Sequence, residues 1–396
     1  MTEKKGYLSA REAAARLGIS RATLYSYVSR GLIRSEERDG PTRHKHYNAA
    51  DVERLQQRQR GRRQPESAAQ QSLRYGMPVL PSAITLIDSG RLYYRGHDAL
   101  TLAQQRSFEA VVALLWQGEV TWPHQSGTVS QAATEPATLE GMQRALTRAA
   151  EGDLAAYRLA PEQVRQCGAR ILQRMTQTAS GHAMESSIAE ALQRAWSPQR
   201  PAAVAALSAA LVLCADHELN VSAFTARCIA SAGATPYHVV IGGLAALSGF
   251  RHGNQSELVA TFWRRATEVG AEAAIGDYLR RNERPPGFDH RLYPSGDPRG
   301  RLLLSLAASL ADEQCATRQR EIIDGVQRLC DGLPNIDVGL VALTHALGLP
   351  QNAPLLLFAL GRTAGWLAHA LEEYERGTLI RPRAQYVGPP PLTQSK

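Results

Sequence analysis

Aromatic residues, paired cysteines and long apolar runs are all scarce in this sequence of 396 residues. Aromatic side chains make up only 6% of the chain, and few β-branched residues accompany them, so extensive sheets are not expected. The five cysteines are scattered, odd in number and without the paired spacing of a metal site. Apolar runs such as Ala202–Ala215 are too short to cross a bilayer, and no apolar stretch follows the first charged residues. These absences favour a cytoplasmic protein with reduced thiols, no membrane partner and no metal.

Alanine and leucine dominate what is present, and both favour helices because they lose little conformational entropy there. Apolar residues make up 44% and charged residues 21%, which is typical of a soluble globular protein with a large core. The length predicts two or three folding units. The net charge of +8 favours anionic partners, but it does not choose between nucleic acid and phosphate-bearing cofactors. The expected class is all-α.

The chain divides by composition into a basic N-terminal module, residues 1–60, and a polar linker, residues 61–73. From residue 74 onward, helical stretches alternate with glycine and proline, and residues 389–396 are expected to form a disordered tail. The strongest strand signal is a hairpin that joins Ala83–Asp88 to Arg91–Tyr94 through Ser89-Gly90.

The N-terminal module carries the signature of a helix-turn-helix. Apolar residues fall on one helical face of Ser9–Gly18, and Ser20 is suited to cap a second helix, Arg21–Ser29. A wing over Asp39–Tyr47 and a third helix opened by Asn48–Asp51 are expected to follow. This order resembles the winged DNA-binding domains of the MerR and excisionase group, and the resemblance implies contacts to DNA by Arg21, Thr23, Tyr25 and Arg43.

A helix-turn-helix fold does not by itself prove DNA binding. The module is equally compatible with a role in packing or assembly, in which its arginines form a solvated face. Contacts to phosphates require those arginines to be free and on one side of the module.

Histidines, an aspartate and arginines occur in unusual settings between residues 217 and 381. His217 follows an Ala/Leu-rich stretch, His252 lies between glycines, and His290 lies in a loop rich in proline and glycine. Each is a weak sign alone, because a lone histidine is more often a structural residue with satisfied hydrogen bonds. The remaining members of the set are Asp337, Arg299, Arg362 and Arg381.

The order of these segments resembles the citrate synthase family from about Leu73 to Gly388. Other segments that carry the resemblance are Ser82–Asp88, Leu92–Asp98, Ser107–Glu109, Leu114–Glu119, Gly361–Glu373 and Arg381–Gly388. So many motifs in one order are not expected by chance. The resemblance implies an almost all-helical citrate-synthase fold. It has a large domain, residues 74–253 and 348–388, and a small domain, residues 254–347, that closes over the substrates.

The resemblance also implies a chemistry, the condensation of acetyl-CoA with oxaloacetate. Asp337 is then the base that deprotonates the methyl group of acetyl-CoA, His252 stabilises the enol, and His290 donates to the ketone of oxaloacetate. The groups implied to hold the two carboxylates are His217, Arg299, Arg362 and Arg381.

CoA enters this scheme as a co-substrate, with no permanently bound cofactor, and is expected to lie against Pro286, Gly287 and Phe288. In the family the last arginine reaches the active site of the partner subunit, so Arg381 implies a homodimer. His97 and His369 are expected to be structural or to support the residues that touch the substrate, because the family's chemistry does not use these positions.

Three departures from the family pattern leave the preferred substrates open. The small residues usual after the central histidine are replaced by the polar run Asn254-Gln255-Ser256. Asp289 precedes the loop histidine and is expected to keep His290 protonated and to repel an anionic substrate. Val338 stands where the family has an aromatic residue, and it is expected to enlarge the pocket or remove a lid.

Three hypotheses remain at this point. The first is a synthase that makes citrate, with 2-methylcitrate from propionyl-CoA as a near variant, since one methylene is worth only about 1–3 kcal/mol of discrimination. The second is a transcriptional regulator whose synthase-like body senses a metabolite. The third is a synthase whose N-terminal module only assists assembly.

Overall fold

The computed structural model describes residues 7–38, 44–53, 55, 80–123, 135–182, 186–250, 252–253, 255–384 and 386–389. The chain divides into two compact units, Met1–Pro81 (unit 1) and Ser82–Lys396 (unit 2). The expected linker, residues 61–73, and most of the expected tail lie outside the described residues. Within the described ranges, no helix combines the length and apolar character that crossing a bilayer requires.

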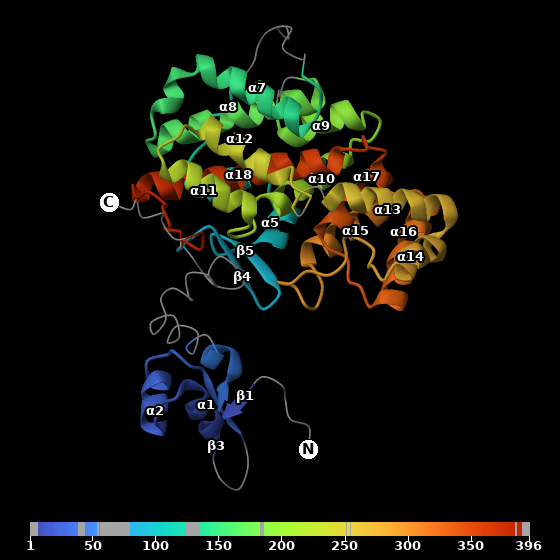
Figure 1. The fold of residues 1–396 in the computed structure, drawn as a ribbon. Helices are drawn as coiled ribbons and strands as arrows, with labels where there is room; N and C mark the ends of the chain where they lie inside the picture. Colours follow the sequence, from blue (N-terminus) through green and yellow to red (C-terminus); the bar gives the residue numbers. More distant parts are fainter. Residues whose placement is uncertain are drawn as a thin grey trace. The chain divides into compact units, whose positions relative to one another are not determined.

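Unit 1 combines two short helices with a small antiparallel sheet (Figure 1). Its elements are β1 (Tyr7–Ser9), α1 (Ala10–Leu17), α2 (Arg21–Ser29), β2 (Ser35–Arg38) and β3 (His44–Asn48), and the strand order is β1-β3-β2. The predicted cap at Ser20 is confirmed, and Ser9 caps the first helix in the same way. The side chains of Ser9 and Ser20 accept hydrogen bonds from the backbone at the start of α1 and α2, and Gly18 ends α1 with φ +62°.

Of the predicted wing, residues 39–43 lie outside the described ranges, and the rest lies in β3, which pairs with β2 just before the wing. Residues 49–53 and 55 are helical, and the backbone N–H of Asp51 donates to the Asn48 side chain over 3.1 Å, as expected of a capped helix start. A small core holds the unit together, made of Leu8, Ala13, Ala14, Leu17, Leu24, Ile33, Tyr47 and Val52.

Unit 2 is built almost entirely of helices, which confirms the predicted class (Figure 1). Its strands are β4 (Thr85–Asp88), β5 (Arg91–Tyr94) and β6 (His97–Asp98). Its first helices are α5 (Ala99–Gln105), α6 (Phe108–Trp116), α7 (Leu139–Gly152), η1 (Leu154–Tyr157), α8 (Pro161–Ser180), α9 (Ile188–Trp196), α10 (Ala203–Cys214), α11 (Val221–Ser231) and α12 (Pro236–Leu247). They are followed by α13 (Gln255–Val269), α14 (Ala271–Arg280), α15 (Pro298–Leu310), α16 (Glu313–Cys330), α17 (Ile336–Leu347) and α18 (Ala353–Arg376).

The long helix α18 forms the centre of unit 2 and packs against α6, α8, α10, α11 and α12. Nearly all of its residues from Ala353 to Ala370 are buried, including the polar side chains of Arg362 and His369. A helix that is buried on every face needs partners for its polar side chains from the surrounding elements. The residues that contact Arg362 belong to the candidate site, and those that contact His369 form a buried polar network beside it.

The predicted hairpin is confirmed: β4 pairs with β5 in antiparallel register, with Asp88 opposite Arg91. Both turn residues have positive φ, +52° at Ser89 and +75° at Gly90, which is the geometry of a tight two-residue hairpin turn. The short strand β6 adds to the other edge of β5 and was not anticipated.

Helices α13 to α17 gather on one side of unit 2 (Figure 1). The closest packing in this group is between α15 and α17. A Cβ added at Gly300 of α15 would lie 2.3 Å from the backbone oxygen of Asn335, so only glycine permits this approach. The division of unit 2 into the predicted large and small domains stays a prediction.

Candidate active site

A paired loop brings two of the predicted site segments together. Asp289 N–H donates to the Leu333 carbonyl over 2.6 Å, Asn335 N–H donates to the Gly287 carbonyl over 2.9 Å, and Phe288 forms an isolated bridge with Pro334. The loop that carries His290 is therefore joined to the segment that begins α17 with Asp337. Residues far apart in sequence acquire a fixed separation because backbone hydrogen bonds join their segments.

His217 and His290 lie edge to face, with ring centroids 5.2 Å apart. Tyr293 completes this cluster: its hydroxyl lies 3.0 Å from Nε2 of His217, and its ring centroid lies 5.1 Å from that of His290. Nδ1 of His290 accepts a hydrogen bond from the Leu292 N–H over 3.2 Å. The proton of a neutral His290 therefore lies on Nε2, which makes no hydrogen bond with the described residues and is available as a donor.

Arg299 is held by the aspartate two residues before it. The Asp297 carboxylate accepts from Nε of Arg299 over 3.0 Å and from Nη2 over 2.8 Å, and both side chains are almost fully buried. Asp297 also caps α15 and accepts from the Ile336 N–H over 3.2 Å, at the start of α17. Although burial opposes its ionisation, the Arg299 charge and hydrogen bonds hold the pKa of Asp297 below its usual value. This pair fixes the guanidinium relative to Asp337.

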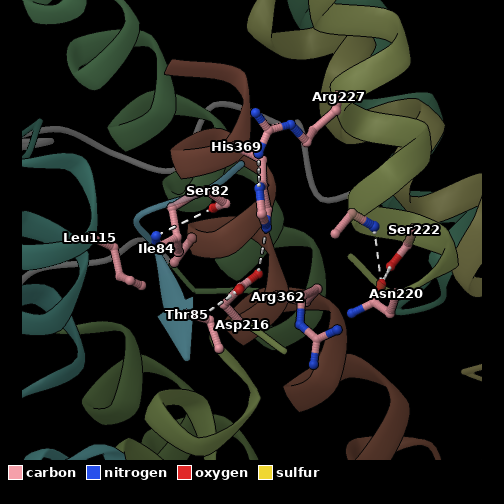
Figure 2. A network of polar contacts seen from close by, with 12 residues as sticks. Ser82, Ile84, Thr85, Leu115, Asp216, Asn220, Ser222, Arg227, Arg362 and His369 are labelled. Atoms are coloured by element: carbon pink, nitrogen blue, oxygen red, sulfur yellow. Dashed lines mark hydrogen bonds and ion pairs between the residues drawn. The ribbon is translucent and has the colours of Figure 1, made fainter. Parts of the chain in front are cut away.

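Arg362 and His252 flank the ring of Phe358, with the Arg362 guanidinium carbon 4.6 Å and the His252 ring centroid 6.2 Å from its centroid. Nε of Arg362 donates to the Cys214 carbonyl over 2.7 Å, and its two terminal nitrogens make no hydrogen bond with the described residues. Nε2 of His252 lies 2.8 Å from the Ser222 hydroxyl. That hydroxyl donates to Oδ1 of Asn220 over 2.8 Å (Figure 2).

Asp337 lies in the first turn of α17, next to the cap residue Asn335. Its Oδ1 accepts a short hydrogen bond, 2.5 Å, from the hydroxyl of Ser256, which is 2% exposed and belongs to α13. Burial raises the pKa of Asp337, and the Ser256 hydrogen bond and the charges of Arg299 and Arg362 counter only part of that effect. A carboxylate with a raised pKa is a stronger base than an exposed aspartate.

All three histidines are neutral at pH 7. Burial, reinforced by the charges of Arg299 and Arg362, lowers the pKa of His217 well below its usual value. Burial and the Arg362 charge lower the pKa of His252 to about 4. Burial and the Arg299 charge also lower the pKa of His290. The same two arginines act on the histidines and on Asp337, so these groups belong to one site.

Comparisons with known proteins show which family the chain belongs to. The model of the citrate synthase C-terminal domain matches residues 73–383, and a helix-turn-helix domain matches residues 7–60. The chain belongs to the citrate synthase family.

Relatives in the citrate synthase family include a "Citrate synthase" of Haloferax volcanii, 28% identical over 79% of this chain and 94% of that protein. "2-Methylcitrate synthase 2" of Corynebacterium glutamicum is 27% identical over the same shares, 79% and 94%. "Citrate synthase 2" of Bacillus subtilis is 36% identical over 48% of this chain, and the chain spans only 52% of that relative. The crystal structure of citrate synthase from Thermotoga maritima superposes with a TM-score of 0.63 and 24% identity, covering 81% of this chain and 96% of that one.

The expected influence of Asp289 on His290 is wrong. The pKa of His290 is lowered rather than raised, because burial and Arg299 dominate it. Asp289 has φ +67°, and its exposed carboxylate instead accepts from Arg284 over 2.6 Å and from the Leu333 N–H over 3.1 Å. The negative charge of Asp289 is therefore paired with the Arg284 guanidinium on the exposed side of the loop.

The other predicted residues have mixed outcomes. Gly287 is buried with φ +87°, where an added Cβ would collide with Val259 and Val338, while Pro286 and Phe288 are half-buried beside it. Val338 is fully buried, and its expected effect on the pocket stays a prediction. Arg381 is exposed and makes no hydrogen bond or ion pair with the described residues of its own chain.

In unit 1, Arg21 and Tyr25 are exposed on α2 and Thr23 is half-buried. Arg43 and Asn254 lie outside the described residues. In the parts of the chain with assigned positions, no group of three or more His, Cys, Asp or Glu residues is arranged to hold a metal ion.

The inspection of the sequence missed several residues that complete the site, namely Tyr293, Ser256, Asp297 and Ser222. Two signals pointed to Asp297: it precedes a proline, as helix caps often do, and it stands two residues before a predicted arginine. No local pattern identifies Tyr293 or Ser256 as partners of His217 and Asp337, because 76 and 81 positions separate the partners.

Proposed function

We propose that unit 2 catalyses the condensation of acetyl-CoA with oxaloacetate and water to give citrate and CoA, with propionyl-CoA and 2-methylcitrate as a near variant. The observation that carries the proposal is the convergence, from separate elements, of one carboxylate of raised pKa, three neutral imidazoles and two buried guanidinium groups. A Claisen condensation needs a base, donors to two developing oxyanions and cationic holders for the acceptor's carboxylates.

The first step assigned here is removal of a proton from the methyl group of acetyl-CoA by Asp337. Its raised pKa supports this role, because a general base works best when its pKa approaches the operating pH. His252 donates to the thioester oxygen as the enol forms. Ser222 holds the imidazole in place, because its hydroxyl lies 2.8 Å from Nε2 of His252.

The second step assigned here is attack of the enol carbon on the ketone of oxaloacetate. His290 donates from Nε2 to the ketone oxygen, a role that the Leu292 hydrogen bond to Nδ1 supports. The two terminal nitrogens of Arg362 make no hydrogen bond with the described residues, so they are suited to a bidentate contact with one carboxylate of the acceptor. The charges of Arg362 and Arg299 both act on His217. Water then cleaves the thioester of the citryl-CoA intermediate and releases CoA.

Arg381 joins this site from the partner subunit of a homodimer in the proposal. Its exposure and its lack of a partner among the described residues of its own chain support that role. CoA lies against the loop that contains Pro286, Gly287 and Phe288. We also propose a cytoplasmic location, which the five free cysteines support.

Release of the free CoA thiol from purified protein tests the proposal, with acetyl-CoA and propionyl-CoA in parallel and with oxaloacetate present or absent. Asp337→Asn is expected to lower kcat by about a hundredfold or more, as loss of a general base does. Asp324→Asn, which changes an exposed aspartate of α16, is the matched control and is expected to behave as the wild type. Folded wild-type protein that releases no CoA with either donor would refute the proposed reaction.

DNA binding by unit 1 is a second candidate function, favoured by one observation. Helix α2 is capped by Ser20 and presents Arg21 and Tyr25 to solvent, with Tyr25 52% exposed. These side chains lie at the start of the helix that reads the major groove in helix-turn-helix proteins. Binding of the full chain to genomic DNA fragments at low salt tests it. Arg21→Ala is expected to weaken binding and reduce its salt dependence, and no binding at low salt would rule the function out.

A further inference from the structure

Between the end of α10 and His217, three contacts from two other elements, β5 and α18, hold the backbone. The Tyr94 hydroxyl donates to the Asp216 carbonyl over 3.1 Å, Arg362 donates to the Cys214 carbonyl, and Gly365 N–H donates to the Ala215 carbonyl over 3.0 Å. The last carbonyls of a helix lack intrahelical partners, so these contacts satisfy groups that would otherwise be buried without a hydrogen bond.

The Asp216 carboxylate anchors this segment from the side. It is fully buried, it accepts a 2.6 Å hydrogen bond from the Thr85 hydroxyl of β4, and its Oδ1 lies 3.2 Å from Nε2 of His369 on α18 (Figure 2). Asp216 immediately precedes His217, and Glu218 after it has φ +51°, a conformation that costs a non-glycine residue energy. Such a turn persists where the surrounding structure holds it.

The tautomer of His369 follows from its other neighbour. Nη1 of Arg227 lies 3.2 Å from Nδ1 of His369, and a guanidinium can only donate, so Nδ1 is the acceptor. The imidazole proton is then on Nε2, where it faces Asp216. Figure 2 shows the His369 ring between Arg227 and Asp216. Because Arg227 can only donate, it determines which nitrogen of His369 accepts and which one carries the proton.

Arg227 is itself fixed by two glutamates of α18. Its Nε donates to Glu373 over 2.6 Å and its Nη1 donates to Glu372 over 2.8 Å, and the Arg227 and Glu373 side chains are fully buried. Glu372 also accepts from the Ala83 N–H over 2.8 Å, next to β4. A buried ion network is weak support for stability, since apolar side chains often replace one without loss. The role of this network is to fix which atoms donate and which accept around Arg227 and at Nδ1 of His369.

The close approach of α18 to this segment is a separate observation. A Cβ at Gly365 would lie 2.3 Å from the Ala215 carbonyl oxygen and 2.4 Å from Oδ1 of Asp216. Helix and segment are thus in direct backbone contact, one turn after Arg362. A shift of Asp216 would be passed to His217 through the peptide bond and to Arg362 through the Cys214 carbonyl.

We propose that Asp216 and His369 are positioning residues that hold His217 and Arg362 in the arrangement that grips the carboxylates of the acceptor. This inference rests on the proposed function, and it assigns a role to a buried cluster that the reaction itself does not use. It predicts that the cluster governs the affinity for a dicarboxylic 2-oxo acid more than the chemical steps.

The test compares two substitutions of His369 in the full chain. In His369→Asn the amide oxygen replaces Nδ1 and accepts from Arg227, but the side chain does not reach Asp216. In His369→Gln the amide nitrogen replaces Nε2 and still faces the Asp216 carboxylate. We expect His369→Asn to raise the Kd for oxaloacetate, measured by isothermal titration calorimetry, and the KM on the order of tenfold to a hundredfold, since displacements near 1 Å have such effects. We expect kcat to change far less and His369→Gln to recover most of the affinity.

Tyr374→Phe is the matched control, because it removes one hydrogen bond of α18, to the Ala234 carbonyl, without touching the network. Should His369→Asn fail to fold, as judged by circular dichroism, Thr85→Val removes the other donor to Asp216 from the partly exposed hairpin and is expected to weaken oxaloacetate binding as well. The inference is overturned if the variants bind oxaloacetate as tightly as the wild type, if Asn and Gln are equally impaired, or if Tyr374→Phe has the same effect.

The wild type separates this inference from the proposed function. Wild-type protein that binds oxaloacetate but does not release CoA refutes the reaction and leaves the positioning role to be judged on the calorimetric Kd values. Wild-type protein that neither binds nor reacts refutes both.

Discussion

The hydrogen bond from Ser256 to Asp337 leads to the most specific expectation about the proposed reaction. Ser256→Ala removes the only side-chain hydrogen bond that Asp337 receives from the described residues, at a position where the serine is 2% exposed. The other groups that act on Asp337 are unchanged: Arg299 and Arg362 lower its pKa, and burial and Asp297 raise it. The variant therefore isolates one contribution.

The size of the effect follows from the charge on the acceptor. A hydrogen bond to a charged group is worth about 1.5–3 kcal/mol, and one pKa unit corresponds to about 1.4 kcal/mol, so we expect the pKa of Asp337 to rise by about one to two units. Because the base acts when it is deprotonated, kcat/KM rises with pH through this pKa. Loss of the donor therefore moves the acid limb of the profile to higher pH.

The assay is the pH dependence of kcat/KM for oxaloacetate-dependent CoA release. Ser256→Thr keeps the hydroxyl and is expected to keep the wild-type acid limb, and Ser309→Ala, which removes an exposed hydroxyl from α15, serves as the control. A merely structural role would lower the plateau of the profile without moving the limb. If Ser256→Ala leaves the acid limb at the wild-type pH, then either Asp337 is not the base or the Ser256 hydrogen bond does not help to set its pKa.

Three further predictions follow from single contacts. Gly365→Ala is expected to destabilise unit 2 by about 1–3 kcal/mol, measured by denaturant unfolding, because the added Cβ overlaps the Ala215 carbonyl; unchanged stability would contradict the close approach. Arg381→Ala is expected to lower kcat/KM while leaving the free energy of unfolding unchanged. The activity of heterodimers that pair an Arg381→Ala chain with an Asp337→Asn chain reveals whether the arginine acts across subunits. Asp289→Asn is expected to leave the pH profile of kcat/KM where it is, since burial and Arg299 set the pKa of His290. A shifted profile would revive the direct influence of Asp289 on His290.

Several parts of the fold were predictable because their causes are local. The Ser89-Gly90 turn, the Ser9 and Ser20 caps and the Gly18 end of α1 each depend on residues within a few positions of one another. The helical class followed from the abundance of alanine and leucine. The histidines, Asp337 and the arginines of the candidate site were predicted from their order along the chain, which resembles that of the citrate synthase family.

The error at Asp289 shows where local reasoning ends. Adjacency in sequence suggested that its carboxylate acts on His290, but the positive φ at Asp289 directs the carboxylate to Arg284 and to the backbone of Leu333. A side chain's neighbours in space depend on backbone dihedral angles, which the residue order alone does not specify.

The sequence by itself determined the helical class, the two-part organisation and the set of groups available for chemistry, because these depend on composition, spacing and short-range capping. Only the tertiary structure decided which groups meet. The Ser256 donor to Asp337, the Tyr293 contact to His217 and the Asp216–His369 pair each join elements far apart in the chain. Their protonation and direction depend on burial and on charges brought close by folding, so they follow from the packing of α18 and its neighbours rather than from any local pattern.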